Sequence, residues 1–236
     1  MIFTRYLAAA VACMTVATPV HAGVDDWVQR QLDRHLPLDA DTVARGLRAA
    51  LEKGTQHAVE TLGHENGFWV HPTLRIPVPP NLRKVEAGLR QLRQDKIADD
   101  FIHSLNRAAE DATPAARAIF LEAIRNMTVP DALGILKGPP DAATRYFRQH
   151  AQAPLAAAFR PIVARSTAAV GVTASYKRFV KKASPFGLVD AQEFDLDEYV
   201  TAKALDALFQ LIADEERHIR EDPLARTTEL LRKVFR

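Results

Sequence analysis

Two acid–histidine pairs have the spacing of helical metal ligands. Asp100 precedes His103 by three positions, and Glu215 precedes His218 by three. On a helix this spacing places both side chains of a pair on one face, as helical di-iron sites require. Such sites need two further carboxylates, and the candidates are Glu110 and Glu122. We favour the alternative, in which both histidines are surface residues of charged helices, and we expect no metal.

The sequence contains no motif of a known catalytic centre. His64-Glu65 begins like the zinc motif of metalloproteases, but position 68 is Phe and the next histidine is His71. There is no Gly-x-Ser-x-Gly elbow and no glycine-rich phosphate loop. We therefore expect no catalytic residues and no cofactor, with a metal-dependent or hydrolytic enzyme as the alternative.

Several arginines and one asparagine could bind an anion. Guanidinium groups suit carboxylates and phosphates because they present several donors in one plane. The candidate set is Arg75, Asn106, Arg107, Arg148 and Arg226. Arg107 can also pair with Glu110, three positions later on the same helix. The alternative, which we favour, is that Asn106, Arg107 and Glu110 form a buried polar network that fixes helices in register.

The charge balance argues against nucleic acid as a partner. The chain has 31 basic and 29 acidic residues, so its net charge is only +2. The one basic cluster, residues 176–182 (YKRFVKK), has interleaved aromatic residues. In an exported chain this cluster fits an anionic lipid or envelope polymer better than a nucleic acid, and a solvated helix face is simpler still.

The N-terminal residues resemble an export signal. Arg5 precedes an apolar run over residues 6–17, and Val20-His21-Ala22 offers a small-x-small cleavage site. We expect cleavage near Ala22 and one mature domain over residues 23–236, located in the periplasm. The alternative is a lipid anchor on Cys13, the only cysteine, which follows a weak lipobox. No later apolar run is long enough to span a membrane.

The rest of the chain predicts an all-α, single-domain multi-helix bundle. Apolar periodicity, caps and breakers place helices at residues 23–36, 39 or 41–62, 81–92, 95–111, 113–127, 129–136, 141–150, 151–169, 173–183, 195–217 and 223–236. The helix over 195–217 is apolar around most of its circumference, so other helices must surround it. It begins on acids and ends on bases, as its dipole prefers.

Residues 64–80 interrupt the helices with a proline-rich, aromatic arm. Its four prolines remove backbone donors and favour extended backbone, so the arm is not helical. An arm of this length is often functional. We expect Phe68, Trp69 and Ile76 to line or cover an apolar groove, with Arg75 at its charged end. The alternative is that these aromatics pack onto the bundle and only cover its core.

Five ordered motifs carry a resemblance to a known family. They are RIPVP at residues 75–79, NRAAE at 106–110, AATRYFR at 142–148, FDLDEYV at 194–200 and IREDPLARTT at 219–228. Over residues 46–235 the chain resembles the bacterial exported family catalogued as domain of unknown function 4197. The resemblance implies a helical, single-domain protein of Gram-negative-type envelopes and implies no activity. The family usually has Gly at the position of Ala207, and neither His103 nor His218 belongs to its motifs.

These observations favour a non-enzymatic exported protein. We expect it to bind an amphipathic or anionic small ligand, or an envelope protein. A structural envelope adaptor is a further alternative, and it would show a large exposed apolar patch. The sequence does not indicate an oligomeric state.

Overall fold

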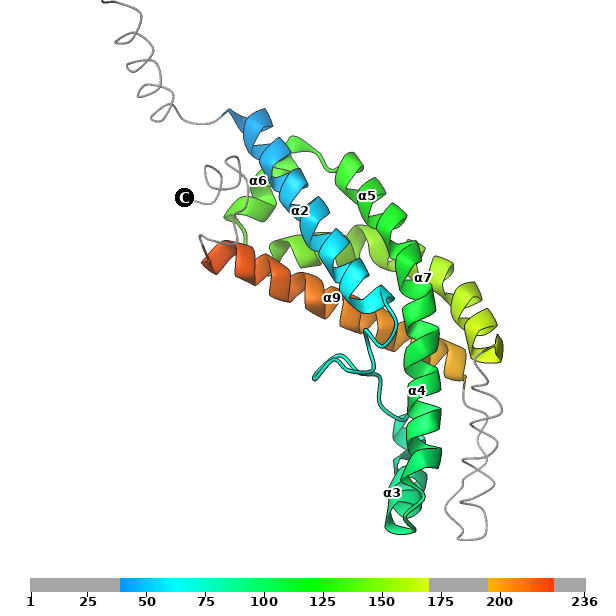
Figure 1. The fold of residues 1–236 in the computed structure, drawn as a ribbon. Coiled ribbons are helices and arrows are strands. Elements are labelled where there is room, and N and C mark those ends of the chain that lie inside the picture. The colour runs from blue at the N-terminus through cyan, green and yellow to red at the C-terminus, as the bar shows by residue number, and fades with distance from the viewer. Residues whose placement is uncertain (1–38, 170–194, 223–236) are drawn as a thin grey trace, which may run out of the picture. The chain divides into compact units, whose positions relative to one another are not determined.

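The computed structural model describes residues 39–169 and 195–222. These ranges are helical apart from short connections and an arm of turns and irregular backbone over residues 64–79 (Figure 1). The elements are α2 (Ala40–Gly63), η1 (Pro80–Leu82), α3 (Arg83–Gln91), α4 (Asp95–Ala112), η2 (Thr113–Ala115), α5 (Ala116–Asn126), α6 (Val129–Lys137), α7 (Ala142–Ala169) and α9 (Leu196–Glu221). No strand occurs in the described ranges, so the all-α prediction is confirmed. Within the same ranges, no helix combines the length and apolarity needed to cross a membrane.

Several predicted features lie outside the described residues. They are the signal segment 1–22 with Cys13, the helices 23–36, 173–183 and 223–236, the basic cluster 176–182, and Arg226.

Side-chain caps begin α2 and α9 where the sequence predicts these helices to start. The carboxylate of Asp39 accepts a hydrogen bond from the amide of Thr42 at 2.8 Å and begins α2. Asp195 accepts from the amide of Glu198 at 2.9 Å and begins α9. These bonds satisfy amide donors that a helix start leaves without an intrahelical acceptor. The arm after α2 is not helical until η1, as predicted.

A threonine lies at the junction before α5 and another at the junction before α6. Thr113 does not cap a new helix, because its hydroxyl donates to the carbonyl of Ala109 at 2.8 Å and its backbone stays helical. The α4 helix therefore passes directly into η2. The cap of α6 is Thr128, whose hydroxyl accepts from the amide of Asp131, while the Asp131 carboxylate accepts from the amide of Thr128. Bonds from Thr128 hold the pKa of Asp131 below its ordinary value of 3.8.

Residues 141–150 and 151–169 form one helix, α7, although two were predicted. Pro154 and Pro161 lie inside it, and each lacks the amide hydrogen of one helical bond. The helix continues because apolar residues on both sides of the prolines are buried in one core: Phe147, Ala151, Leu155, Phe159 and Val163. Tertiary packing here outweighs the local breaking tendency.

The core lies where α7 packs against α4, α5, α6 and α9, with α2 packed against α5, α6 and α9 (Figure 1). The ring of Phe120 meets Phe147 and Phe209 edge to face, with centroids 5.2 and 6.2 Å apart. Ten residues of α9 are buried, including Val200, Ala204 and Leu208. Other helices thus cover most of α9, as its sequence predicts.

Candidate ligand-binding cleft

Asn106 on α4 holds the arm by its backbone. Its side-chain oxygen accepts from the amide of Ile76 at 2.8 Å, and its nitrogen donates to the carbonyl of Ile76 at 2.9 Å. The same nitrogen donates to the carbonyl of Ile102 at 2.7 Å. Because Asn106 is fully buried, each of these bonds replaces one with water. The arm is thereby fixed at Ile76, between Arg75 and Pro77.

Glu110, one turn after Asn106, holds the start of the arm. Its buried carboxylate accepts from the amides of Asn66 at 3.1 Å and Phe68 at 3.2 Å. Arg107 adds a 3.4 Å contact. A buried carboxylate requires such donors, and these are charge-assisted bonds. Asn106 and Glu110 are therefore buried polar groups that bind the arm to α4, whereas the side chain of Arg107 is partly exposed.

The turn that presents these amides to Glu110 requires a glycine. Asn66 has a left-handed backbone with φ of 65°, a conformation that asparagine tolerates. A Cβ atom on Gly67 would lie 2.5 Å from the carbonyl oxygen of Thr61 and 2.8 Å from that of Leu62. Only glycine fits this approach to the end of α2.

The predicted arm residues have different environments. Phe68 and Ile76 are buried in the core, which agrees with the alternative in which the arm packs onto the bundle. Trp69 is half-buried, with the guanidinium of Arg75 3.5 Å from its ring centroid and the ring of His103 edge-on at 5.1 Å. Cation–π contacts of this kind hold a guanidinium without removing its charge. Arg75 is therefore positioned but still cationic.

A cleft of about 410 Å³ lies between the arm and α9. The arm and the start of α3 contribute Thr73, Leu74, Arg75, Ile76, Pro77, Pro80 and Arg83, and α9 contributes Tyr199, Lys203, Asp206, Ala207 and Gln210. The hydroxyl of Tyr199 donates to the carbonyl of Pro77 at 3.0 Å and joins the two walls. Burial raises the pKa of Tyr199 above its ordinary value of 10.0, with a partial offset from Arg83. The phenol is thus protonated at neutral pH and able to donate.

The lining of the cleft is cationic. Arg75, Arg83 and Lys203 face a single carboxylate, Asp206. Lys203 lies 3.5 Å from Asp206, whereas Arg75 and Arg83 have no carboxylate within ion-pair distance in the described part of the chain. Three positive charges against one negative charge favour an anion in the cleft.

Most of the predicted anion-binding residues do not line this cleft. Arg148 lies over the ring of Phe209, 4.6 Å from its centroid, and Arg107 pairs with Glu110 and Asp111. Of the described members of that set only Arg75 lines the cleft, so the structure does not bring them together here. Arg83, Tyr199 and Lys203 were not predicted as site residues, because in the sequence they are ordinary polar positions on helix surfaces. In the sequence, only the proline-rich arm indicated a binding site in this region.

The two acid–histidine pairs do not form a metal site. Each of the four residues contacts a different neighbour: Asp100 contacts Lys96, His103 contacts Asn66, Glu215 contacts His57 and His218 contacts Asp222. Among the described residues, no group of three or more His, Cys, Asp or Glu side chains could hold a metal ion. The i, i+3 spacing places the two members of each pair on one face of a helix, but the pair on α4 and the pair on α9 do not meet.

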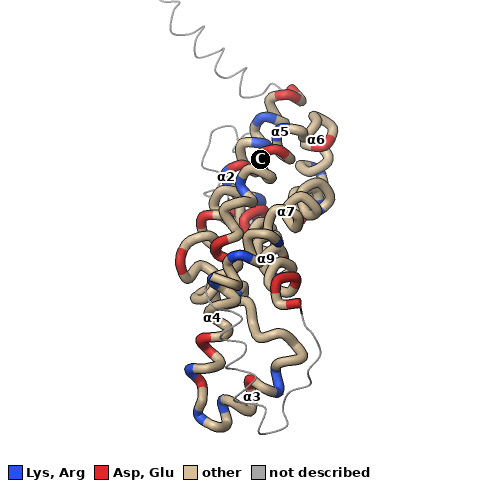
Figure 2. Tube along the Cα trace, turned by 90° about the vertical axis from the view of Figure 1, so that its right-hand side faces the viewer, with Lys and Arg blue, Asp and Glu red and all other residues tan. Residues whose placement is uncertain are grey.

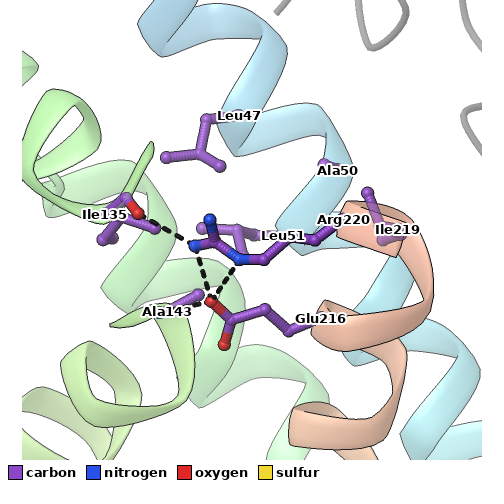
Figure 3. Close-up of a pocket in the computed structure, with 8 residues that line it drawn as sticks. All are labelled: Leu47, Ala50, Leu51, Ile135, Ala143, Glu216, Ile219 and Arg220. Carbon is purple, nitrogen blue, oxygen red and sulfur yellow. Dashed lines mark hydrogen bonds and ion pairs between the residues drawn. The ribbon is translucent and has the colours of Figure 1, made fainter. Parts of the chain in front are cut away.

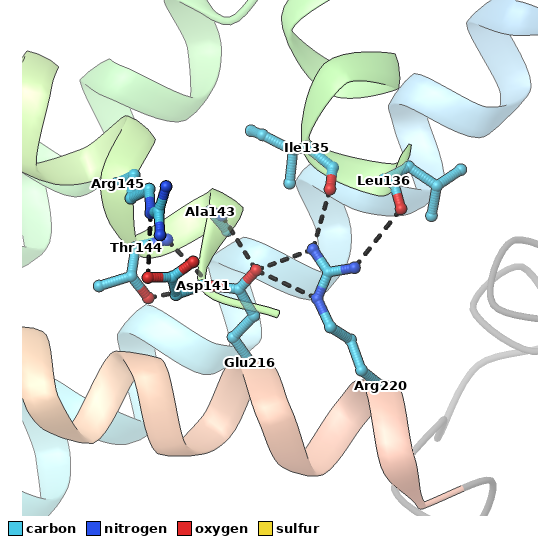
Figure 4. A network of polar contacts seen from close by, with 8 residues as sticks. All are labelled: Ile135, Leu136, Asp141, Ala143, Thr144, Arg145, Glu216 and Arg220. Atoms are coloured by element: carbon cyan, nitrogen blue, oxygen red, sulfur yellow. Dashed lines mark hydrogen bonds and ion pairs between the residues drawn. The ribbon is translucent and has the colours of Figure 1, made fainter. Parts of the chain in front are cut away.

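A second buried carboxylate joins α9 to the start of α7 (Figure 4). Glu216 accepts from the amides of Ala143 and Thr144, each at 3.0 Å, and from the hydroxyl of Thr144 at 2.9 Å. Arg220 donates to Glu216 at 2.8 Å and to the carbonyl of Ile135 at 2.9 Å. The pair thus satisfies amides at the start of α7 and a carbonyl at the end of α6.

The hollow beside this ion pair is too small for a ligand. Its volume is about 20 Å³, which is enough for one water molecule. Figure 3 shows Leu47 and Leu51 of α2 around the guanidinium of Arg220, with Glu216 below it. The site is a structural joint between helices.

The comparisons with known proteins give one match. Residues 37–236 match the family model described as a protein of unknown function, DUF4197. The chain belongs to this family. No curated protein and no solved structure matches it. The resemblance stated from the five motifs is confirmed, and the family description assigns no activity.

Within this DUF4197 chain, the motifs that carry the resemblance make structural contacts. NRAAE supplies Asn106 and Glu110, which bind the arm, and RIPVP supplies the Ile76 backbone that Asn106 binds. AATRYFR supplies the amides of residues 143 and 144 that Glu216 caps. FDLDEYV supplies Tyr199, which reaches the arm at Pro77. Three of these motifs, RIPVP, NRAAE and FDLDEYV, therefore position the two walls of the cleft.

Proposed function

We propose that this protein binds a small amphipathic ligand with an anionic group in the cleft between the arm and α9. The cleft, with its cationic lining, is the observation that carries the proposal. Its volume of about 410 Å³ lies in the range of small-molecule sites, roughly 300–1,000 Å³. In this proposal the protein holds its ligand without reacting with it.

Each lining residue has a role in this proposal. Arg83 and Lys203 stand on opposite walls and bind the anionic group, because a guanidinium and an ammonium both form charge-assisted bonds with phosphate or carboxylate oxygens. The rings of Pro77, Pro80 and Tyr199 contact the apolar part. Asn106 and Glu110 are positioning residues, since they hold the arm without lining the cleft.

The surface of the described residues favours a small molecule over a protein partner. Val70 and Leu92 are the large apolar residues exposed there, and they lie on different segments, the arm and the end of α3. A docking face or an adaptor would be expected to present a contiguous apolar patch. We therefore place an envelope protein partner and a structural adaptor second.

We further propose that the protein acts in the periplasm after cleavage near Ala22, or as a lipid-anchored form through Cys13. The support is the charged, apolar and small-residue order of the first 22 residues. Amphipathic anions are constituents of an envelope, so this location agrees with the proposed ligand class.

Calorimetric titration with decyl methyl phosphate, below its micelle concentration, tests the proposal. Arg83→Gln and Lys203→Gln should each weaken binding about five- to tenfold, as expected for one lost charge-assisted contact. Lys96→Gln, which removes an equal charge from an exposed pair with Asp100, should leave binding unchanged. Dimethyl phosphate, which lacks the chain, should bind at least about tenfold more weakly.

The proposal is wrong if decyl methyl phosphate does not bind at millimolar concentration. It is also wrong if Lys96→Gln weakens binding as much as Lys203→Gln does, because net charge and not the cleft would then set the affinity. Equal affinity for decyl methyl phosphate and dimethyl phosphate would show that the cleft does not bind an apolar chain.

A further inference from the structure

One carboxylate lies within the otherwise cationic lining of the cleft. Asp206 follows Lys203 by three positions on α9, and its oxygen lies 3.5 Å from the Lys203 nitrogen. The side chains of Lys203 and Asp206 are 44% and 60% exposed, so a ligand can reach them. In a site for a simple anion this carboxylate is unfavourable, because it repels the anion and competes for Lys203.

A second acceptor stands one turn beyond Asp206. The side-chain nitrogen of Gln210 donates to Asp214 at 3.2 Å, and its side-chain oxygen accepts no hydrogen bond from the described residues. Residues four apart on a helix are neighbours on one face, and both Asp206 and Gln210 line the cleft. An ammonium group has three donors and no acceptor, which matches a carboxylate beside an amide oxygen.

We infer that Asp206 and Gln210 select ligands that carry a primary ammonium group beside their anionic group. This inference rests on the proposed function and names the ligand class as an amphipathic zwitterion. The ammonium of the ligand replaces Lys203 at Asp206, and Lys203 then joins Arg83 at the anionic group. Both signs of charge in the lining are thereby matched.

Two matched phosphodiesters test this selectivity by calorimetry on the full mature chain. Decyl 2-aminoethyl phosphate carries the ammonium, and decyl methyl phosphate lacks it. The wild type should prefer the aminoethyl ester about fivefold, as expected for one exposed charge pair. Asp206→Asn should weaken the aminoethyl ester about fivefold and should leave the methyl ester equal or tighter.

Glu215→Gln is the matched control, because it removes the same charge from the same helix. Glu215 pairs with His57 and does not line the cleft, so this variant should keep the wild-type preference. Gln210→Leu should reduce the preference without changing net charge.

The outcomes separate this inference from the proposed function. The inference is overturned if the wild type binds both esters with equal affinity. It is also overturned if Asp206→Asn changes the affinities for the two esters in the same direction and to the same extent as Glu215→Gln does. In either case the cleft is still an anion site. If neither ester binds to the wild type, both the inference and the proposed function are wrong. Circular dichroism of each variant confirms that it is folded.

Discussion

At the scale of single residues, the buried polar groups of this protein act as structural contacts. Glu110 and Glu216 are both nearly inaccessible. Glu110 accepts three backbone amides of the arm, and Glu216 accepts two at the start of α7. The sequence predicts that Asn106, Arg107 and Glu110 are a polar network, from their helical spacing. It does not identify Ile76 as the partner of Asn106, because Ile76 is 30 positions away and is bound through its backbone atoms.

Glu110→Ala tests whether the carboxylate of Glu110 stabilises the arm. Removing the carboxylate leaves the amides of Asn66 and Phe68 without their acceptor, so the free energy of unfolding should fall by about 2–4 kcal/mol. The adjacent Asp111→Ala removes an exposed partner of Arg107 and should cost less than about 1 kcal/mol. Urea denaturation followed by circular dichroism measures both. An equal loss of unfolding free energy in Glu110→Ala and Asp111→Ala would contradict this role of Glu110.

At the scale of elements, caps and breakers locate most helix ends, and packing decides the rest. The starts of α2 and α9 follow from Asp39 and Asp195, which cap them through local bonds. The continuity of α7 through Pro154 and Pro161 does not follow from local sequence, because it depends on the buried residues that other helices cover. The joint between α6 and α7 likewise depends on α9, through Arg220 and Glu216.

Two glycines at the end of α6 give a matched test of this joint. A Cβ atom on Gly138 would lie 2.7 Å from the carbonyl oxygen of Gly134 and 2.8 Å from the Cβ of Ala142. Gly138→Ala should therefore lower the free energy of unfolding by about 1–3 kcal/mol through overpacking. A Cβ atom on Gly134 meets nothing within 4 Å, so Gly134→Ala should raise that free energy by about 0.5–1 kcal/mol.

Thermal unfolding of the two alanine variants measures this difference. The midpoint should fall for Gly138→Ala and rise for Gly134→Ala. Stabilisation by both substitutions would show that the turn between α6 and α7 has room for a side chain.

At the scale of the whole molecule, the fold class is predictable and the cleft is not. Helical periodicity over most of the chain and the lack of alternating patterns predict an all-α protein. The cleft depends on residues far apart in sequence, since Tyr199 and Pro77 are separated by 122 positions. Acidic and basic residues are interspersed along the helices (Figure 2), so only the arrangement in space concentrates Arg75, Arg83 and Lys203.

The central claim is that this cleft holds an amphipathic anion, and native mass spectrometry of the mature protein recovered from its envelope fraction tests it most directly. The wild type should retain a small-molecule mass that is lost on denaturation, and the double variant Arg83→Gln, Lys203→Gln should retain much less of it. The denatured mass of the same sample also reports whether the chain begins after Ala22 or carries a lipid on Cys13. A bound mass that is identical in the wild type and the double variant, or a wild type with no bound mass, would contradict the claim.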